Sequence, residues 1–256
     1  MREVTQRAIL PRFRNLSDGD VIEKASDDLV TIADREAEDM LAEGLAALDP
    51  SLAIVGEEAA HADPAVLGAL GGDCWIVDPI DGTHNFAHGK PPFGIILAQA
   101  SGGLCHSGWI YDCLSDRFCH VHRGAGAFVD GERIASRTTG EAPPVAAIAR
   151  IFLTEEQRAL VDARLAPHYR LVDIPRCAAE QYPRLALGEN DVSSFKRTLP
   201  WDHGAGVLWL NEAGGKAARL DGSEYRVDEH EKPGLIGAST PAIWDEFAKR
   251  ALAPRD

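Results

Sequence analysis

The chain has 256 residues, of which 45% are hydrophobic, enough to bury one large core or two fused ones. Its formal net charge of -14 argues against nucleic acid and anionic membranes as partners, because both are polyanions that an acidic protein repels. The composition therefore predicts a globular protein with neither kind of partner.

The cysteines and the absence of targeting segments predict a cytoplasmic protein. The five cysteines are an odd number and include no C-x-x-C pair, which is typical of reduced thiols. The sequence shows no N-terminal apolar segment of a signal peptide and no run of about 18 apolar residues. Nothing in it points to export or to membrane insertion.

The N-terminal region predicts two helices with a polar stretch between them. Residues 1–14 form a short helix that Pro11 interrupts or ends, and a polar stretch, 15–28, follows and contains Lys24. Apolar residues at helical spacing then predict an amphipathic helix that begins near Thr31 or Asp34. These residues are Ala33, Ala37, Met40, Leu41, Gly44, Leu45 and Leu48. A carboxylate at Asp34 is most often a helix cap.

Two strands are predicted to bring acidic residues to one place. The apolar run 52–56 ends at Glu57 and Glu58, and the next apolar run ends at Asp78. Neighbouring strands that both end in acids feed one cluster, and a hard cation needs several carboxylates gathered in this way. Glu57 is therefore a candidate metal ligand, although two acids in a solvated loop would give the same pattern. The Ala-, Gly- and Pro-rich loop 59–72 carries no recognisable chemistry.

The stretch from Cys74 to Phe86 carries the strongest functional signal. Asp78 and Asp81 lie three residues apart across a turn that contains Pro79, so both carboxylates and the Ile80 carbonyl can converge on one hard cation. Gly82 allows close backbone approach, and the free N–H groups of Gly82 and Thr83 suit a phosphate oxygen. The sequence thus places a metal and a phosphate side by side.

The middle of the chain predicts an antiparallel sheet built from hairpins. Alternating apolar residues separated by Gly and Asp turns indicate four strands, 94–100, 104–111, 117–122 and 127–134. A zinc site is conceivable among nearby residues of these strands, but their spacing lacks a closed ligand set. The residues are His106, Cys119, His120 and His122, and the alternative is that they lie on a half-wet sheet face.

A composition break at 138–144 divides the chain into an α+β half, 1–140, and an α/β half, 141–256. The second half alternates strands and helices. The predicted strands are 145–152, 170–174, 192–195, 217–220 and 235–238, and the helices are 155–165, 178–187, 206–213 and a last one from Thr240 through Leu252. Asp202 precedes the helix 206–213, where an acid is favourable.

Several of these segments resemble the inositol monophosphatase family of Mg²⁺-dependent, Li⁺-sensitive phosphatases. W-I-V-D-P-I-D-G-T-x-N-F, from Trp75 to Phe86, is similar to its signature, and Trp201–Gly206 resembles its second motif, W-D-x-A-x-G, with Gly204 where relatives carry Ala. Gly56-Glu57-Glu58 and Leu29–Asp34 also match family segments, the latter L-V-T-x-x-D. The N-terminus holds less of the first helix than relatives do.

The resemblance implies a layered α/β (α+β) sandwich, the sugar-phosphatase fold. An antiparallel sheet half would precede a smaller α/β half, with the active site at their junction. It also implies a homodimer, the common assembly of the family.

The resemblance further implies hydrolysis of a small, inositol-1-phosphate-like monoester by water, with two or three Mg²⁺ ions and no covalent intermediate. Mn²⁺ would substitute, whereas Ca²⁺ and Li⁺ would inhibit. Two ions would be held by Glu57, Asp78, the Ile80 carbonyl, Asp81 and Asp202, and a third by Glu57 and Asp34. Asp34 and Thr83 would orient the water, and the Gly82 and Thr83 amides would hold phosphate oxygens. An acidic phosphatase needs such cations, because its own charge repels phosphate esters.

Other readings of the same residues remain. Relatives in the family act on histidinol phosphate, 3'-phosphoadenosine 5'-phosphate or fructose 1,6-bisphosphate. Haloacid-dehalogenase-type phosphatases pair their aspartates as D-x-D, whereas the spacing here is D-x-x-D. A non-catalytic, acidic metal-binding module would need the carboxylates but neither Thr83 nor the phosphate-facing Gly82.

The substrate pocket is where the sequence departs from animal inositol monophosphatases. Arg176-Cys177-Ala178-Ala179 matches their G-T-A-A pocket segment, but Phe195 stands where they carry a Glu that hydrogen-bonds inositol. Strict inositol specificity is therefore not expected. Lys196 and Arg197 follow; either the strand register shifts and they point to solvent, or they reach the pocket. In the second case they and Arg176 would favour a substrate with a second anionic group.

Overall fold

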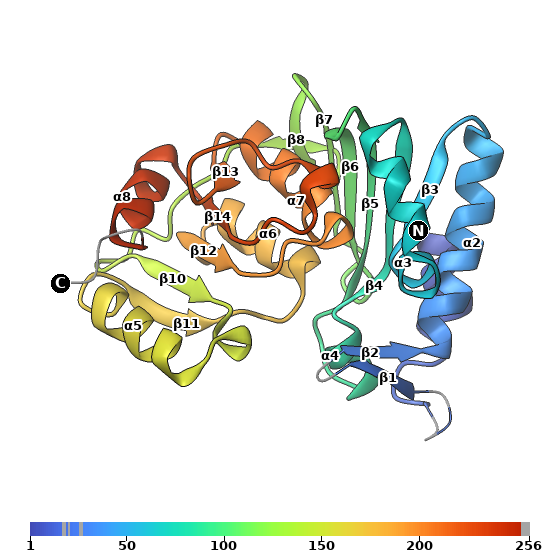
Figure 1. The fold of residues 1–256 in the computed structure, drawn as a ribbon, viewed down its shortest axis with the longest axis horizontal. Helices are drawn as coiled ribbons and strands as arrows, with labels where there is room; N and C mark the ends of the chain where they lie inside the picture. The colour runs from blue at the N-terminus through green and yellow to red at the C-terminus, as the bar shows by residue number, and fades with distance from the viewer. Residues whose placement is uncertain (17–18, 20, 26–27, 252–256) are drawn as a thin grey trace.

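Two β-sheets, with helices between them and on their outer faces, make up the protein (Figure 1). The computed structural model describes residues 1–16, 19, 21–25 and 28–251. The layers follow the order helix, sheet, helix, sheet, helix, which agrees with the layered sandwich expected from the sequence.

The first sheet has seven strands in the order of the chain, β3 to β9. β3 runs parallel to β4, and every later neighbour is antiparallel. Because β3 and β4 are parallel, their carboxyl ends meet at the same edge. The strands are β3 (Ala53–Gly56), β4 (Cys74–Asp81), β5 (Gly94–Ser101), β6 (Leu104–Asp112), β7 (Phe118–His122), β8 (Gly126–Val129) and β9 (Glu132–Ile134).

Two predictions about this sheet's surroundings are wrong. The strand predicted over 127–134 is a hairpin, because Asp130 and Gly131 have φ of 50° and 86° and form a tight left-handed turn between β8 and β9. The loop predicted over 59–72 is mostly helical. It contains α3 (Glu57–Ala62) and a 3₁₀ helix (Pro64–Gly71), whose N-terminus Asp63 caps by accepting from the Ala65 N–H.

The outer layer on this sheet consists of α2 (Ile32–Leu48) and the N-terminal helix. α1 (Arg2–Val4) continues into one π-helical turn that ends at Ile9, ahead of Pro11. Thr31 caps α2, and the predicted apolar spacing buries Ala33, Ala37, Leu41 and Leu45, whereas Leu48 is 77% exposed. The polar stretch before α2 contains a hairpin, β1 (Val21–Ala25) with β2 (Asp28–Thr31); the Lys24 side chain lies outside the described part of the chain.

The second sheet has five strands in the order β11-β10-β12-β14-β13. They are β10 (Val145–Ile148), β11 (Arg170–Asp173), β12 (Val192–Phe195), β13 (Lys216–Arg219) and β14 (Leu235–Ala238). The strand predicted over 145–152 ends at Ile148, and a 3₁₀ turn (Arg150–Phe152) follows. On its outer face lie α5 (Glu155–Leu165) and α8 (Pro241–Ala251), while the predicted end of α8, Leu252, lies outside the described residues.

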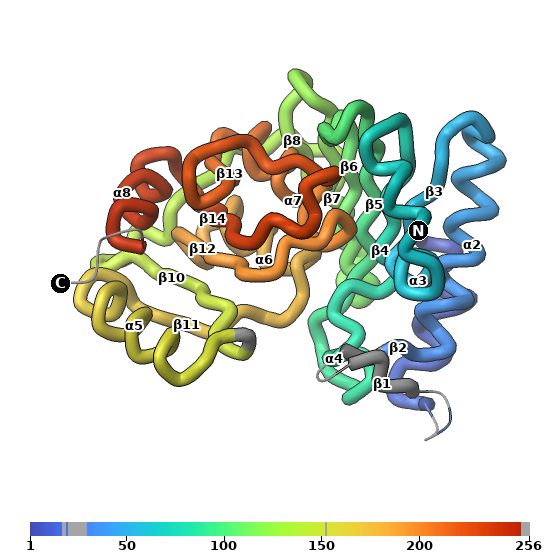
Figure 2. The backbone as a smooth tube through the Cα atoms, viewed as in Figure 1, coloured from blue at the N-terminus to red at the C-terminus, as the bar shows by residue number. Residues whose placement is uncertain are grey.

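Two helices fill the space between the sheets, α6 (Ala178–Ala186) and α7 (Pro200–Glu212) (Figure 2). One hydrophobic cluster joins Ile76 and Ile96 of the first sheet to Trp209 of α7 and Leu235 of the second sheet. The chain changes sheets between Ile134 and Val145, next to the predicted boundary at 140, yet both halves contribute to this shared core. The division into halves remains a prediction.

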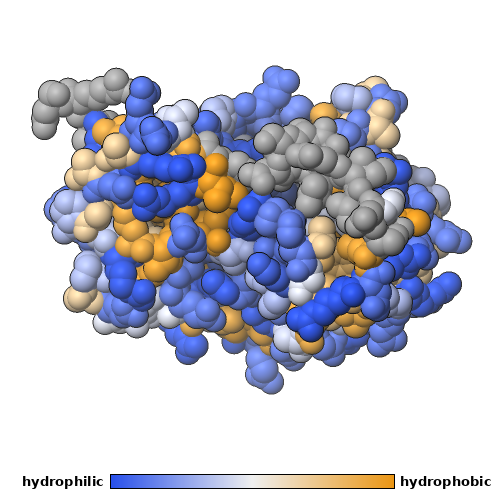
Figure 3. Space-filling view, turned by 90° about the horizontal axis from the view of Figure 1, so that it is seen from below, coloured by the Kyte–Doolittle hydropathy of each residue, from blue (hydrophilic) through white to orange (hydrophobic). Residues whose placement is uncertain are grey.

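The surface is mostly polar with local apolar patches. Figure 3 shows the molecule from below, where hydrophobic residues gather on the half that carries α5 and β11. Ile151, in the 3₁₀ turn after β10, is 38% exposed.

Candidate active site

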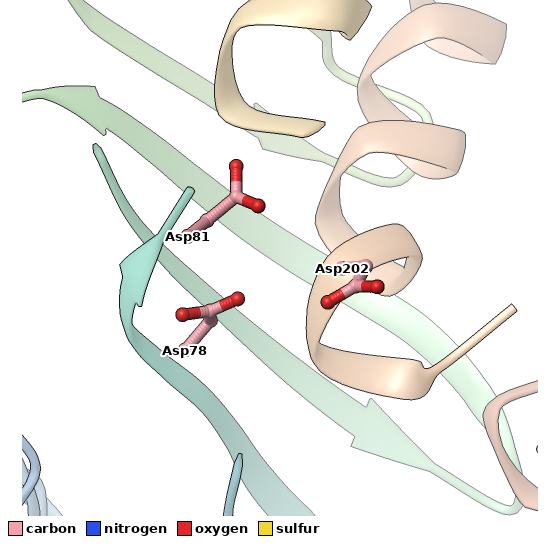
Figure 4. A group of neighbouring side chains, drawn as sticks. All are labelled: Asp78, Asp81 and Asp202. Carbon is pink, nitrogen blue, oxygen red and sulfur yellow. The ribbon is translucent and has the colours of Figure 1, made fainter. Parts of the chain in front are cut away.

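Three aspartates from distant parts of the chain meet where the end of β4 lies beside the first turn of α7 (Figure 4). Asp78 and Asp81 come from the end of β4, and Asp202 comes from the first turn of α7. Oxygens of the three carboxylates lie within 4.8 Å of one another. Among the described residues this is the single group of three or more potential metal-ligating side chains at that spacing.

Local backbone features aim these three side chains. The turn predicted across Pro79 is instead an irregularity inside β4, because its pairing with β5 slips between Asp78 and Asp81. The usual alternation of side chains therefore does not send the two aspartates to opposite faces. The helix of Asp202 begins at Pro200, not at Gly206 as predicted, because proline is favourable at the first helical position. Asp202 therefore lies inside the first turn of α7.

Without a cation, the carboxylates of this cluster repel one another in a buried place. Asp78 is 1% exposed, and burial, followed by the nearby Glu57, Asp81, Asp202 and Asp34 carboxylates, raises its pKa well above the usual range. Its Oδ1 is buried and has no hydrogen-bond partner among the described residues. Bound divalent cations would supply the missing partner and neutralise the repulsion, so these oxygen ligands fit hard metal ions.

Asp81 links the cluster to the second half of the chain. Its Oδ2 accepts a 2.5 Å hydrogen bond from the backbone N–H of Ala179 in the first turn of α6. Burial raises the pKa of Asp81, and N–H donors, with Ala179 the strongest, oppose the shift. The carboxylate is thus held in place by the first turn of a helix, through a residue 98 positions further along the chain.

Thr83 and Asp34 form a second polar pair beside the cluster. The Thr83 hydroxyl lies 3.0 Å from Asp34 Oδ1 and 2.8 Å from the Ile80 carbonyl oxygen. Asp34 also caps α2, since its Oδ2 accepts from the Thr31 N–H at 2.7 Å and from the Thr31 hydroxyl at 2.5 Å. Burial raises the pKa of Asp34 to about 7. The cap expected from the sequence is present, and the same carboxylate also contacts the site.

Glu57 begins α3 directly after β3, and its charge contributes to the raised pKa of Asp78. Sequence reasoning missed the residue that holds this helix, Glu38 of α2. The Glu38 carboxylate accepts from the N–H groups of Glu58 at 2.9 Å and Ala59 at 2.8 Å, and it fills the space that a side chain at Gly56 would need. The available signal was its position four residues after Asp34, on the same helix face.

The turn after β4 has the conformation that its glycine predicts. Gly82 has φ of 89°, and a Cβ there would lie 2.9 Å from the Pro92 carbonyl oxygen, so only glycine fits without strain. Gly82 precedes α4 (Thr83–Ala87). Asn85, to which the sequence assigned no role, donates from Nδ2 to the carbonyls of Pro92 and Pro175 at 2.9 Å each. It ties this turn to the segment that carries Arg176.

One cavity of about 130 Å³ brings nearly all predicted site residues together, enough space for a phosphate group and several waters. It is lined by the predicted Glu57, Asp78, Ile80, Asp81, Gly82, Thr83, Asp202, Arg176, Cys177, Ala178, Phe195, Lys196 and Arg197. Asp34 is not part of the lining, because it is fully buried behind Thr83. The lining residues that sequence reasoning missed are His84, Ala149, Ile151, Ile174, Gln181 and His203.

An aromatic cluster backs the side of the cavity formed by Phe195. The Phe195 ring stacks on Tyr182 at 5.8 Å and meets His203 edge-on at 4.8 Å. Burial lowers the pKa of His203 to about 3, so the imidazole is neutral. Its Nε2 must donate to the Arg197 carbonyl, 3.1 Å away, since a carbonyl only accepts, and its Nδ1 accepts from the Tyr182 hydroxyl at 2.8 Å.

No three of the residues considered for zinc, all of them in the described part of the chain, bring their ligand atoms within 4.8 Å of one another. His120 stacks on Phe128, and His122 Nδ1 lies 2.9 Å from the Ser107 hydroxyl.

All five cysteines are buried and unpaired by disulfides. In the part of the chain that the structure describes, every helix is too short or too polar to cross a bilayer.

Comparison with known proteins agrees with the geometry. The profile of the inositol monophosphatase family matches residues 3–253. The chain is 32% identical to the inositol-1-monophosphatase of Bacillus subtilis, over 89% of this chain and 85% of that protein. It is 31% identical to a fructose-1,6-bisphosphatase/inositol-1-monophosphatase of Thermotoga maritima, over 77% of this chain and 73% of that protein.

Further relatives differ in substrate but share the fold. A histidinol-phosphatase of Chlorobaculum parvum is 30% identical over 86% of this chain and 82% of its own length. The solved structure of an IMPase from Thermotoga maritima superposes with a TM-score of 0.80 at 27% identity, covering 98% of this chain and 92% of that one. The chain therefore belongs to the inositol monophosphatase family, whose members are phosphatases acting on phosphate monoesters.

Proposed function

We propose that this protein is a Mg²⁺-dependent phosphatase that hydrolyses a small phosphate monoester by direct attack of water. The observation that carries the proposal is the convergence of three carboxylates within 4.8 Å, beside the Thr83–Asp34 pair and in one cavity. Asp78, Asp81, Asp202, Glu57 and the Ile80 carbonyl would hold two ions, and Asp34 with Glu57 a third. Bound Mg²⁺ would polarise the phosphoryl group, lower the pKa of bound water and stabilise the leaving alkoxide.

The residues beside the ions would position water and phosphate. The Thr83 hydroxyl donates its single hydrogen bond to Asp34 or to the Ile80 carbonyl, which leaves its lone pairs free to accept a hydrogen bond from a water in the cavity. The buried Asp34 carboxylate, 3.0 Å from the Thr83 hydroxyl, would hold that hydroxyl in its orientation. The N–H groups of Gly82 and Thr83 would hold phosphate oxygens beside the cations.

The Thr83–Asp34 contact also favours an enzyme over a metal-binding module. A module that only held a cation would need the carboxylates, but not a hydroxyl oriented by a buried acid at the edge of the cavity. The names of the relatives point to inositol phosphate, fructose bisphosphate or histidinol phosphate as substrates, and the family membership does not decide among these. An inositol-1-phosphate-like monoester remains the first candidate, and the other phosphates are the alternatives.

Phosphate release from a panel of monoesters and bisphosphates, with and without Mg²⁺, tests the proposal. Hydrolysis should require Mg²⁺, persist with Mn²⁺ and be inhibited by Ca²⁺ and Li⁺. Binding of Mg²⁺ without any phosphate release would favour the non-catalytic module. The free, buried thiols support a cytoplasmic location, and sedimentation velocity would test the homodimer that the family resemblance implies.

A further inference from the structure

Two basic side chains separate the catalytic cavity from a second depression. Lys196 and Arg197 line both the cavity and a neighbouring hollow of about 430 Å³. The other residues of this distal hollow are Thr198, His230, Glu231 and Pro233. The two spaces are therefore neighbours on either side of Lys196 and Arg197.

The backbone that carries these cations is anchored from behind. The carbonyl of Lys196 accepts from the Gly234 N–H at 3.0 Å, and that of Arg197 accepts from His203 at 3.1 Å. The Tyr225 hydroxyl lies 3.1 Å from the Thr198 carbonyl oxygen and 3.2 Å from that of Leu199. These hydrogen bonds hold the backbone in place, and the Lys196 and Arg197 side chains are exposed and line both spaces.

A buried guanidinium holds the two walls of the distal hollow together. Arg219 is 1% exposed, and its Nη1 donates to the Thr198 hydroxyl at 2.8 Å and to the Lys232 carbonyl at 2.6 Å. Its Nη2 donates to the Glu229 carbonyl at 3.0 Å. The segment after β12 and the loop before β14 are therefore fixed relative to each other, so the hollow is formed before any ligand binds.

The charge of the wall indicates what the hollow accepts. In a chain with a net charge of -14, a second anionic group on a substrate is unfavourable unless local cations compensate for it. Lys196, Arg197 and Arg176 line the cavity, whereas Phe195 offers no hydrogen bond to the hydroxyls of a polyol. The lining of the distal hollow itself carries two cations, Lys196 and Arg197, against one carboxylate, Glu231, so it favours an anion over a neutral sugar hydroxyl.

We propose that the distal hollow is a subsite for a second anionic group, so that the preferred substrates are phosphate monoesters whose alcohol part carries a phosphate or carboxylate several bonds away. Lys196 and Arg197 pair with that group, and the hollow beyond them receives it. This inference rests on the proposed phosphatase function and specifies the substrate class of the same site.

A series of simple substrates tests the subsite directly. Monophosphates and bisphosphates of ethane-1,2-diol, butane-1,4-diol and hexane-1,6-diol share one leaving-group chemistry and differ in the second anion and its distance. With Mg²⁺ present, the ratio of kcat/KM for bisphosphate over monophosphate should exceed about tenfold for the longer diols and be smaller for the shortest. Carboxylate-terminated esters of the same lengths distinguish phosphate from carboxylate as the second group.

Variants connect that ratio to the two cations. The double substitution Lys196→Gln and Arg197→Gln should lower the ratio about tenfold, through KM more than through kcat. Lys249→Ala, which removes a cation from the exposed face of α8 outside both hollows, should leave the ratio at the wild-type value. A ratio near one at every length, or a ratio that the double variant does not change, overturns the subsite. Absence of phosphate release from all the esters would instead refute the phosphatase function itself.

Discussion

The hydroxyl of Thr83 lies 3.0 Å from the carboxylate of Asp34, joining the turn after β4 to the capped N-terminus of α2. Neither residue belongs to the three-aspartate group, and Asp34 lies outside the cavity lining. We therefore expect Thr83 to orient the attacking water, a role that can be measured separately from metal binding by the three aspartates.

Thr83→Ala should slow turnover roughly a hundredfold, because the water loses the group that orients it. Mg²⁺ affinity should change little, since Thr83 provides no side-chain ligand in the proposed site. Phosphate-release kinetics and Mg²⁺ titration by calorimetry separate the two effects, and Thr83→Ser should restore most of the rate. A phosphothreonine at this position, trapped during turnover and located by mass spectrometry, would establish a covalent route instead.

Asp78→Asn or Asp81→Asn should abolish Mg²⁺-dependent hydrolysis while leaving the fold intact. Removing one charged ligand forfeits several kcal/mol of charge stabilisation, which corresponds to roughly a thousandfold or more in rate. Circular dichroism of the variants checks the fold, and phosphate release checks the rate. Full activity of the wild-type protein in EDTA would refute the metal requirement.

The metal-free protein should lose stability as pH rises towards neutrality, because the pKa of Asp34 is raised by burial to about 7 in the folded state. In the unfolded chain this carboxyl titrates near pH 4. Its contribution to the free energy of unfolding is therefore fully present below about pH 4 and is lost as pH rises through about 7. Asp34→Asn is always uncharged and should therefore be more stable than wild type at pH 8, by a few kcal/mol, but not at pH 4.

Comparing the two proteins at each pH cancels the opposite effect of His203, whose pKa is lowered by burial to about 3 and which destabilises the folded state as pH falls below about 6.5. Denaturant unfolding of both metal-free proteins from pH 4 to 8 makes the measurement, and saturating Mg²⁺ should stabilise wild type most at pH 8. If the free energy of unfolding depended on pH in the same way for wild type and variant, the raised pKa of Asp34 would be contradicted.

Glu38→Ala should destabilise the fold by about 1–3 kcal/mol, since two N–H groups at the start of α3 lose their acceptor. Mg²⁺ affinity should also weaken, because α3 carries Glu57. Glu43→Ala, an exposed substitution on the same helix, is the matched control and should alter neither property. Destabilisation with unchanged Mg²⁺ affinity would show that Glu38 is structural only.

Myo-inositol 1-phosphate should be hydrolysed, but with a kcat/KM no more than about tenfold above that of other monoesters, a difference of about 1.4 kcal/mol. The reason is Phe195, whose ring lines the cavity and accepts no hydrogen bond from inositol hydroxyls. A preference of several hundredfold, unchanged by Lys196→Ala and Arg197→Ala, would show that the pocket recognises inositol by other means.

The sequence by itself determined the local geometry of the site. The irregular end of β4 and the left-handed Gly82 after it set the relation of Asp78, Asp81 and Thr83, which therefore depends on neighbours in the chain and is readable from a short motif. The same holds for the buried face of α2, where 3.6-residue periodicity identified Ala37, Leu41 and Leu45. The hairpin found in place of the single strand predicted over 127–134 also depends on local sequence, because Asp130-Gly131 is a recognisable hairpin turn.

Only the tertiary structure decided what arrives at the site from elsewhere. The hydrogen bond from Ala179 to Asp81, the support of α3 by Glu38 and the clamp that Arg219 forms between two loops join residues far apart in sequence, and no local pattern specifies which long-range partners meet. The direction of Lys196 and Arg197 is the clearest case. The sequence left open whether both side chains point to solvent or reach the pocket. In the structure both line the cavity, and Gly234 and His203, which no local pattern specifies, donate to their backbone carbonyls.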